Sequence, residues 1–349
     1  MAFSAKTPAS AFVRIVILMA VAPGCVATKS VTNLDGGASS FALQAVAEVA
    51  LPGSSSRFDY QDIDSKAAHL IIAHMGDNAV DVLNVDDGSV VARVGNIDTP
   101  RGVAVATEPH RIFVTSMPNQ VVILDGDSLK EISRVITGAG PDGIAWDPVH
   151  KVVGVSDQRD GALSILTDSG QGARTQVPLG TETGNVVFDS KRSLFWITVV
   201  RAQGPDALVA IDPTTASITA QLELPGCNGA HGLRLHPNGN SALIACEGNS
   251  LLARVELEGA HTLVTARVGD GPDVLAVDSG LQRLYVAAEA GDLNVFDLSQ
   301  PGLALLNSQR IGDNAHSVGV DSATHRVFFP LSAGSQGKPT LRIMRPSRP

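Results

Sequence analysis

The chain has 349 residues, of which 44% are hydrophobic, 4% aromatic and 17% charged. This composition excludes an intrinsically disordered chain, and the formal net charge of −9 argues against sequence-independent binding of nucleic acid or anionic lipid. The 34 Gly and 19 Pro cut the apolar sequence into short runs, a pattern typical of many short strands.

The N-terminal segment has the features of an export signal. Lys6 and Arg14 precede an apolar run at residues 15–22, which is too short to span a bilayer, so we interpret residues 1–24 as a signal peptide. Two cleavage alternatives remain open: Cys25 becomes the lipidated N-terminus of a lipoprotein, or ordinary cleavage occurs at residues 25–27. Residues 25–40 are polar and rich in Gly and Ser, as in a flexible tether. The expected protein is exported and periplasmic, or attached to the envelope membrane only through that lipid.

Beyond residue 40 the sequence repeats about every 42 residues. The repeated stretches include PRGVAVA, PDGIAWD, PDVLAVD and AHSVGVD, and the spacings between their second residues are 42, 41, 42, 47, 42 and 43. We call these seven second residues the ring residues. They are Asp59, Arg101, Asp142, Gly184, His231, Asp273 and His316.

Each repeat contains four strand-like runs, which predicts an all-β, seven-bladed β-propeller over residues 41–346. The last repeat has only three such runs, while residues 41–51 (FALQAVAEVAL) resemble the fourth run of the other repeats. We therefore expect the N-terminal strand to close the last blade and to leave no open edge. The expected protein is a monomer.

Two stretches carry a family resemblance, RIFVTSMPNQVVILD at residues 111–125 and RLYVAAEAGDLNVFD at residues 283–297. They resemble YVTN-type repeats, and residues 41–346 as a whole are similar to bacterial YncE-like seven-bladed propellers. The resemblance implies an exported propeller. It implies little about activity, because propellers carry both binding scaffolds and unrelated enzymes.

The ring residues begin the innermost strands, so the fold predicts that their side chains surround one mouth of the central channel. His231, Asp273, His316 and Asp59 come from consecutive blades and are suitable ligands for a divalent cation, the one cofactor that the sequence suggests. The alternative is a solvated channel lining in which Arg101 pairs with Asp59 or Asp142.

A second set of positions, 15 residues further on, reaches the same end of each blade. It places His74 near Asp59, and Glu247 and Glu289 follow two of its members. It also brings Cys246 near Cys227, which enters the same blade end four residues before its ring residue. We expect a structural disulfide between these cysteines, with a reactive thiol as the alternative.

Three functions remain open from the sequence. The first is a non-catalytic propeller that binds a small ligand or a protein through the loop face and the channel mouth, at Asp59, Arg101, Asp142, His231, Asp273, His316 and His74. The second is a metal-dependent hydrolase or lyase, by analogy with gluconolactonase-like and streptogramin-lyase propellers. The third is a structural surface protein, in which the ring has no role.

Overall fold

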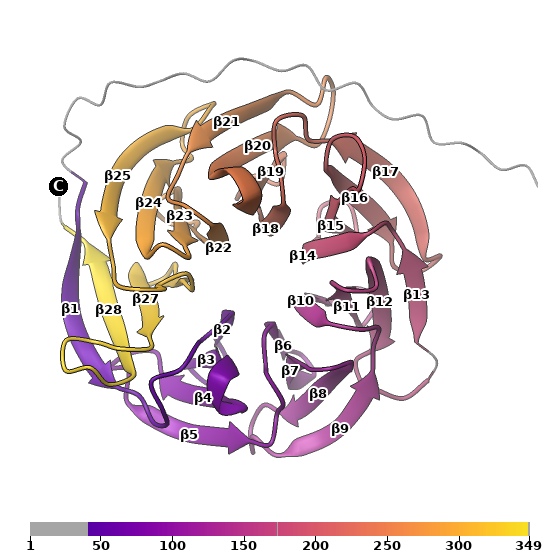
Figure 1. The fold of residues 1–349 in the computed structure, drawn as a ribbon. Helices are drawn as coiled ribbons and strands as arrows, with labels where there is room; N and C mark the ends of the chain where they lie inside the picture. The colour runs from indigo at the N-terminus through magenta and orange to yellow at the C-terminus, as the bar shows by residue number, and fades with distance from the viewer. Residues whose placement is uncertain (1–40, 173, 348–349) are drawn as a thin grey trace, which may run out of the picture.

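The computed structural model describes residues 41–172 and 174–347, so the signal at residues 1–24, Cys25 and the tether at residues 25–40 lie outside the described residues. The described residues form seven four-stranded antiparallel sheets arranged in a ring (Figure 1). The prediction of an all-β, seven-bladed propeller is therefore confirmed. Within this part of the chain, no helix is long and apolar enough to cross a bilayer.

Every blade runs from a strand beside the central axis to a strand at the rim (Figure 1). The innermost strands are β2 (Gln61–Asp64), β6 (Val103–Thr107), β10 (Pro141–Asp147), β14 (Glu182–Asp189), β18 (Ala230–Leu235), β22 (Pro272–Asp278) and β26 (Gly319–Asp321). The second strands are β3 (His69–His74), β7 (His110–Ser116), β11 (Val152–Asp157), β15 (Leu194–Val200), β19 (Ser241–Cys246), β23 (Arg283–Ala288) and β27 (Arg326–Leu331).

The two outer strands complete each sheet, and two short 3-10 turns, η1 (Met75–Asp77) and η2 (Glu247–Asn249), follow second strands. The third strands are β4 (Ala79–Asn84), β8 (Gln120–Asp125), β12 (Ala162–Thr167), β16 (Ala207–Asp212), β20 (Leu251–Glu256), β24 (Asp292–Asp297) and β28 (Thr340–Pro346). The rim strands are β5 (Val90–Gly95), β9 (Glu131–Ile136), β13 (Thr175–Pro178), β17 (Ser217–Glu223), β21 (Leu263–Arg267), β25 (Ala304–Arg310) and β1 (Leu43–Ala50).

The hydrophobic core lies between the blades. Each apolar cluster combines side chains from two neighbouring sheets, as where Trp196 of the fourth blade packs with Leu233 and Ile244 of the fifth. A four-stranded sheet has two apolar faces, and only a neighbour on each side removes both from water. Burial between blades therefore drives ring formation.

The N-terminal strand closes the seventh blade as expected. β1 pairs antiparallel with β28 from Leu43 opposite Pro346 to Ala50 opposite Thr340, and Figure 1 shows the indigo and yellow strands side by side. Leu43 is buried in the same apolar cluster as Met344. This pairing satisfies the backbone hydrogen bonds of the outer edge of β28. It also adds Leu43 to the apolar contact with the sixth blade.

The predicted disulfide is also present. Cys227 and Cys246 are bonded, with their Cα atoms 5.2 Å apart, and both side chains are buried in the fifth blade. The bond joins the loop that leads into β18 to the end of β19, so it fixes the entry to the ring residue His231.

We predict that Leu43→Ala lowers the free energy of unfolding by about 2–4 kcal/mol, because it leaves a cavity beside β28. Val46→Ala on the same strand is the matched control, since Val46 is 53% exposed and its truncation should be nearly silent. Chemical denaturation measures both. Equal stabilities for the two variants, or a chain lacking residues 41–51 that melts like the parent, would contradict closure by β1.

A second prediction concerns the disulfide. The bonded cysteines are 19 residues apart, so a Cys227→Ser/Cys246→Ser double variant should lose roughly 3 kcal/mol of stability by the chain-entropy argument. Thiol labelling of exported protein, denatured without reductant, should leave both positions unlabelled. Labelling of both positions before reduction would show that the bond does not form.

Candidate functional site

The ring residues leave the regular β-ladder just where they face the channel. The pairing of β10 with β11 shifts register between Pro141 and Ile144, around Asp142. The same shift occurs between Ala230 and Leu233, around His231, and between Pro272 and Leu275, around Asp273. A bulge re-aims side chains and often lies beside a functional site, and here it turns the ring residues toward the axis.

Glycines directly after the ring residues bring neighbouring inner strands into close approach. A Cβ on Gly102 would lie 2.2 Å from the carbonyl oxygen of Asp142, and one on Gly232 would lie 1.8 Å from that of Asp273. Both distances are far inside van der Waals contact, so these two positions accept only glycine without backbone movement. The result is that ring residues of adjacent blades lie beside one another.

Hydroxyl groups lock this arrangement from blade to blade. Thr115 Oγ1 donates to the carbonyl of Asp142 at 3.0 Å, and Thr198 Oγ1 donates to that of His231 at 2.8 Å. Ser317 Oγ donates to the carbonyl of Asp59 at 2.5 Å, across the junction of the seventh and first blades. Each hydroxyl lies one blade before the residue that it holds, so the backbone of the ring is fixed by its neighbours.

The ring opens into a cavity of about 300 Å³ at the channel mouth. Five of the seven ring residues line it, Gly184 has no side chain to contribute, and His316 is buried beside Asp273. The lining residues are Arg57, Asp59, Met75, Arg101, Asp142, Gln158, His231, Glu247, Asp273 and Glu289. The structure therefore brings the expected side chains together, and the lining carries five carboxylates against two guanidinium groups.

His231 bridges two of the carboxylates. Its Nε2 lies 3.3 Å from Asp142 Oδ2 and 3.5 Å from Asp273 Oδ1. Arg101 Nη1 lies 3.3 Å from Asp142 Oδ1, so the expected partnership of Arg101 with Asp142 is present.

Arg57 lines the cavity although the sequence repeat did not predict it. Glu289 also lines the cavity, and the sequence indicated it only as the residue after one of the second set of positions. The guanidinium of Arg57 contacts Glu289 Oε1 at 2.5 Å and Asp273 Oδ2 at 3.8 Å. Arg57 lies two residues before Asp59, in the segment that links the closing strand to the first blade. No equivalent position repeats, so the sequence offered no signal for it.

Three side chains are placed to share a metal ion. Ligand atoms of Asp273, Glu289 and His316 all lie within 4.8 Å of one another. Two of these, Asp273 and His316, belong to the predicted ligand set, whereas His231 and Asp59 lie elsewhere on the cavity wall. Glu289 takes part in their place.

At the cavity, several buried polar atoms have charged neighbours but form no hydrogen bond with the described residues. Asp142 Oδ2, Asp273 Oδ1 and His316 Nε2 form no hydrogen bond with any described residue. Buried polar atoms are normally satisfied by protein, water or a bound ligand, and leaving them unsatisfied is costly. Their convergence on one cavity makes it the candidate binding site.

The cavity shifts the pKa values of four of its groups, raising three of them and lowering that of His316. Burial, reinforced by the charges of Asp142 and Asp273, raises the pKa of Asp59 to about 7. Burial also raises the pKa of Asp273 to about 7, although His231 acts against the shift. Burial disfavours the charged form of His231, but Asp142 and Asp273 outweigh it and raise its pKa. Burial and the charge of Arg57 lower the pKa of His316.

The backbone of His74 lies near Asp59 as expected, since Asp59 N donates to the carbonyl of Ala73 at 2.9 Å, but the His74 side chain is not among the residues that line the cavity. It is fully buried inside the first blade, with Nδ1 2.9 Å from Asp81 Oδ2 and Nε2 3.1 Å from Ser56 Oγ. Its ring stacks on Phe58 with centroids 4.0 Å apart. Its position in the repeat was right, but the adjacent carboxylate turns the side chain inward, where it anchors the segment before the first ring residue.

The sequence matches no protein-family model, and no curated protein matches it. Solved structures share the architecture that defines this chain as a seven-bladed β-propeller. Hydrazine synthase from Kuenenia stuttgartiensis has a TM-score of 0.70 at 14% identity, covering 82% of this chain and 94% of that chain. Virginiamycin B lyase from Staphylococcus aureus has a TM-score of 0.69 at 13% identity, covering 87% and 99%. At these identities the likeness shows the fold alone.

The raised carboxyl pKa values predict how stability depends on pH. With a pKa of about 7 when folded and an ordinary value of 3.8, Asp59 holds its proton to higher pH in the folded state. Stability therefore falls as pH rises from about 4 to about 7, and the penalty is complete above that range. In the presence of a chelator, Asp59→Asn should raise the melting temperature by a few degrees at pH 8 and hardly change it near pH 4. A parent-like melting temperature for this variant at pH 8 would contradict the prediction.

Proposed function

We propose that this protein is an exported, non-catalytic binding propeller that holds a divalent cation at the mouth of its central channel. The observation that carries the proposal is the group of three buried ring carboxylates around one axis, Asp59, Asp142 and Asp273, together with hydrogen-bonding capacity on Asp142 and Asp273 that no described residue fills. Like charges at such short range disfavour their own ionisation, and a bound cation relieves that cost.

The donor set favours an ion that accepts both nitrogen and oxygen ligands. Asp273 and His316 are buried, and Glu289 completes the group of three. Mixed imidazole and carboxylate ligands suit Zn²⁺, Mn²⁺ or Fe²⁺, whereas Ca²⁺ and Mg²⁺ favour shells made of oxygen alone. The lowered pKa of His316 keeps its imidazole neutral, which is the form that coordinates a metal.

Arg57 regulates access to this position. Its guanidinium contacts Glu289 and Asp273, two of the three proposed ligands. A metal ion and Arg57 cannot both neutralise the same carboxylates, so the cation binds when the Arg57 side chain moves aside. Glu289 is part-buried and Arg57 is itself partly exposed, which leaves room for this exchange.

Export and the resemblance to YncE-like, YVTN-type propellers belong to the same proposal. The disulfide supports export, because such bonds persist in oxidising compartments outside the cytoplasm. The seven-bladed fold is compatible with the YVTN resemblance.

The proposal predicts stoichiometric metal binding. Calorimetric titration of chelator-treated protein with Zn²⁺ and Mn²⁺ should give one site, and the His231→Ala/His316→Ala variant should bind at least tenfold more weakly. Arg57→Gln should bind more tightly than the parent, because the competing cation is gone. His261→Ala, outside the cavity, is the matched control. A parent that binds neither ion, or a double variant that binds like the parent, refutes the proposal.

A metal-dependent hydrolase or lyase is the second candidate, and one observation favours it. Asp273, a member of the metal-capable group, and Asp59, which lines the same cavity, have pKa values raised to about 7. Such carboxyl groups exchange protons readily at neutral pH. The candidate substrates come from the analogy with gluconolactonase-like and streptogramin-lyase propellers that the sequence suggested. Turnover of virginiamycin B or an aldonolactone by metal-loaded protein, reduced in Asp59→Asn, supports this candidate. Metal binding without turnover leaves the binding function in place.

A further inference from the structure

A second section of the channel lies beyond the ring residues along the innermost strands. The residue three positions after each ring residue lines one of two cavities there, of about 130 Å³ and about 400 Å³. These residues are Asp62, Ala104, Ala145, Val187, Arg234, Ala276 and Gly319. Five of the seven are small and apolar, which leaves space at the axis. Only Asp62 and Arg234 carry charge.

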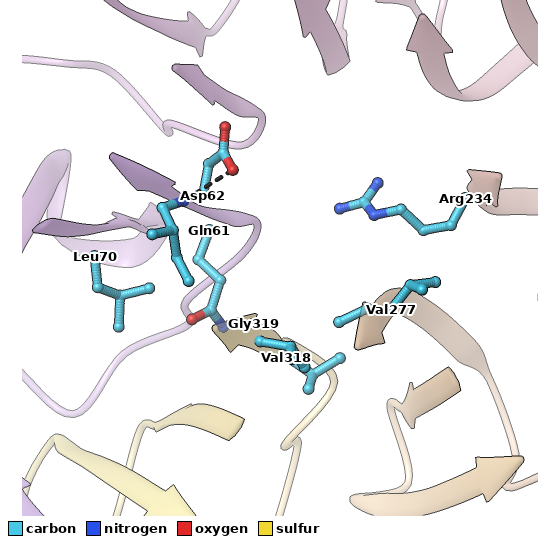
Figure 2. A pocket seen from close by; sticks show the side chains of 10 residues that line it. Gln61, Asp62, Leu70, Arg234, Val277, Val318 and Gly319 are labelled. Atoms are coloured by element: carbon cyan, nitrogen blue, oxygen red, sulfur yellow. Dashed lines mark hydrogen bonds between the residues drawn. The ribbon is translucent and has the colours of Figure 1, made fainter. Parts of the chain in front are cut away.

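The two charged residues differ in how they are satisfied. Asp62 Oδ1 accepts a hydrogen bond from its neighbour's amide, Ile63 N, at 2.8 Å, and Oδ2 accepts one from Val105 N of the next blade at 2.9 Å. The guanidinium of Arg234 donates only to the carbonyl of Leu233, at 3.0 Å, and forms no ion pair with any described residue. Figure 2 shows Arg234 extending into the open centre, opposite Asp62 and Gln61.

The charge on Arg234 therefore has no direct ion pair among the described residues, although Asp62 faces it across the channel. Burial lowers the pKa of Arg234, and the nearby Tyr60 and Asp62 do not restore it. A guanidinium nevertheless stays protonated at neutral pH. Arg234 is half-buried, so its hydration is reduced while it lacks a direct ionic partner, and an anion beside it would be stabilised.

The apolar residues around Arg234 indicate that the anion also has an apolar part. The larger cavity is lined by residues that include Val103, Ile144, Trp146 and Val186, and the smaller by Val318 among others. A volume of about 400 Å³ is within the range of small-molecule sites, in which a few polar groups orient a largely apolar ligand. Guanidinium groups bind carboxylates with two parallel hydrogen bonds.

We propose that the lower channel is a second ligand site, in which Arg234 binds the carboxylate of a small organic acid whose apolar part contacts the surrounding valine, isoleucine and tryptophan side chains. This site is distinct from the channel mouth, which attracts cations, and it does not depend on metal binding there. The two ends of one channel then select ligands of opposite charge.

The test uses hexanoate as the probe and calorimetry at pH 7.5 on the full-length mature protein. The parent should bind one equivalent, and Arg234→Met should bind at least tenfold more weakly while melting at or above the parent's temperature. Arg234→Lys, which keeps the charge but not the planar fork, should fall between them. Arg345→Gln, on the exposed surface of β28, is the matched control and should bind like the parent.

Two further ligands test the chemical class. Hexanamide lacks the charge and inorganic phosphate lacks the apolar body, so each should bind at least tenfold more weakly than hexanoate. The proposal is overturned if the parent binds no hexanoate, if Arg234→Met binds it like the parent, or if phosphate or hexanamide binds equally well. Hexanoate should also raise the melting temperature of the parent and not that of Arg234→Met, which provides a readout independent of calorimetry.

Discussion

The close approach of neighbouring innermost strands is the constraint on which both proposed ligand sites depend. A side chain larger than hydrogen at Gly102 or Gly232 would collide with the backbone of the next blade. Because the strands touch, the residues before these glycines meet around the axis instead of lying apart on separate sheets. The threonine and serine hydroxyls then fix their carbonyl groups, so the mouth is preorganised by backbone contacts and not by the side chains that line it.

Such convergence concentrates charge, and the protein neutralises it unevenly. At the mouth, Arg57 and Arg101 balance only part of the negative charge, so Asp59 and Asp273 hold protons near neutral pH. Deeper in the channel the imbalance is reversed, because two backbone amides donate to Asp62, while Arg234 has no ionic partner in the described part of the chain. A fold selected only for stability would place apolar side chains at these positions, as most blades do three residues after the ring.

The sequence predicted the fold and most of the mouth, because a repeat specifies equivalent backbone positions. Asp142, His231 and Asp273 follow from that equivalence, and so does the closing strand. It does not specify rotamers, so His74 was expected in the cavity although Asp81 and Ser56 hold it inside the blade. The repeat also gives no information about segments that do not recur, so the place of Arg57 in the cavity was not predicted. Glu289 was noted, but its proximity to His316 depends on side-chain reach.

The pairing of β1 with β28 also constrains the order of events during synthesis. Leu43 and Pro346 lie opposite each other in the finished blade, yet one is among the first residues of the propeller to leave the ribosome and the other among the last. The first strand must therefore wait, unpaired, while six blades are made. Contacts so distant in sequence are slow to form. The ring can therefore close only after the last strand of the propeller has been synthesised.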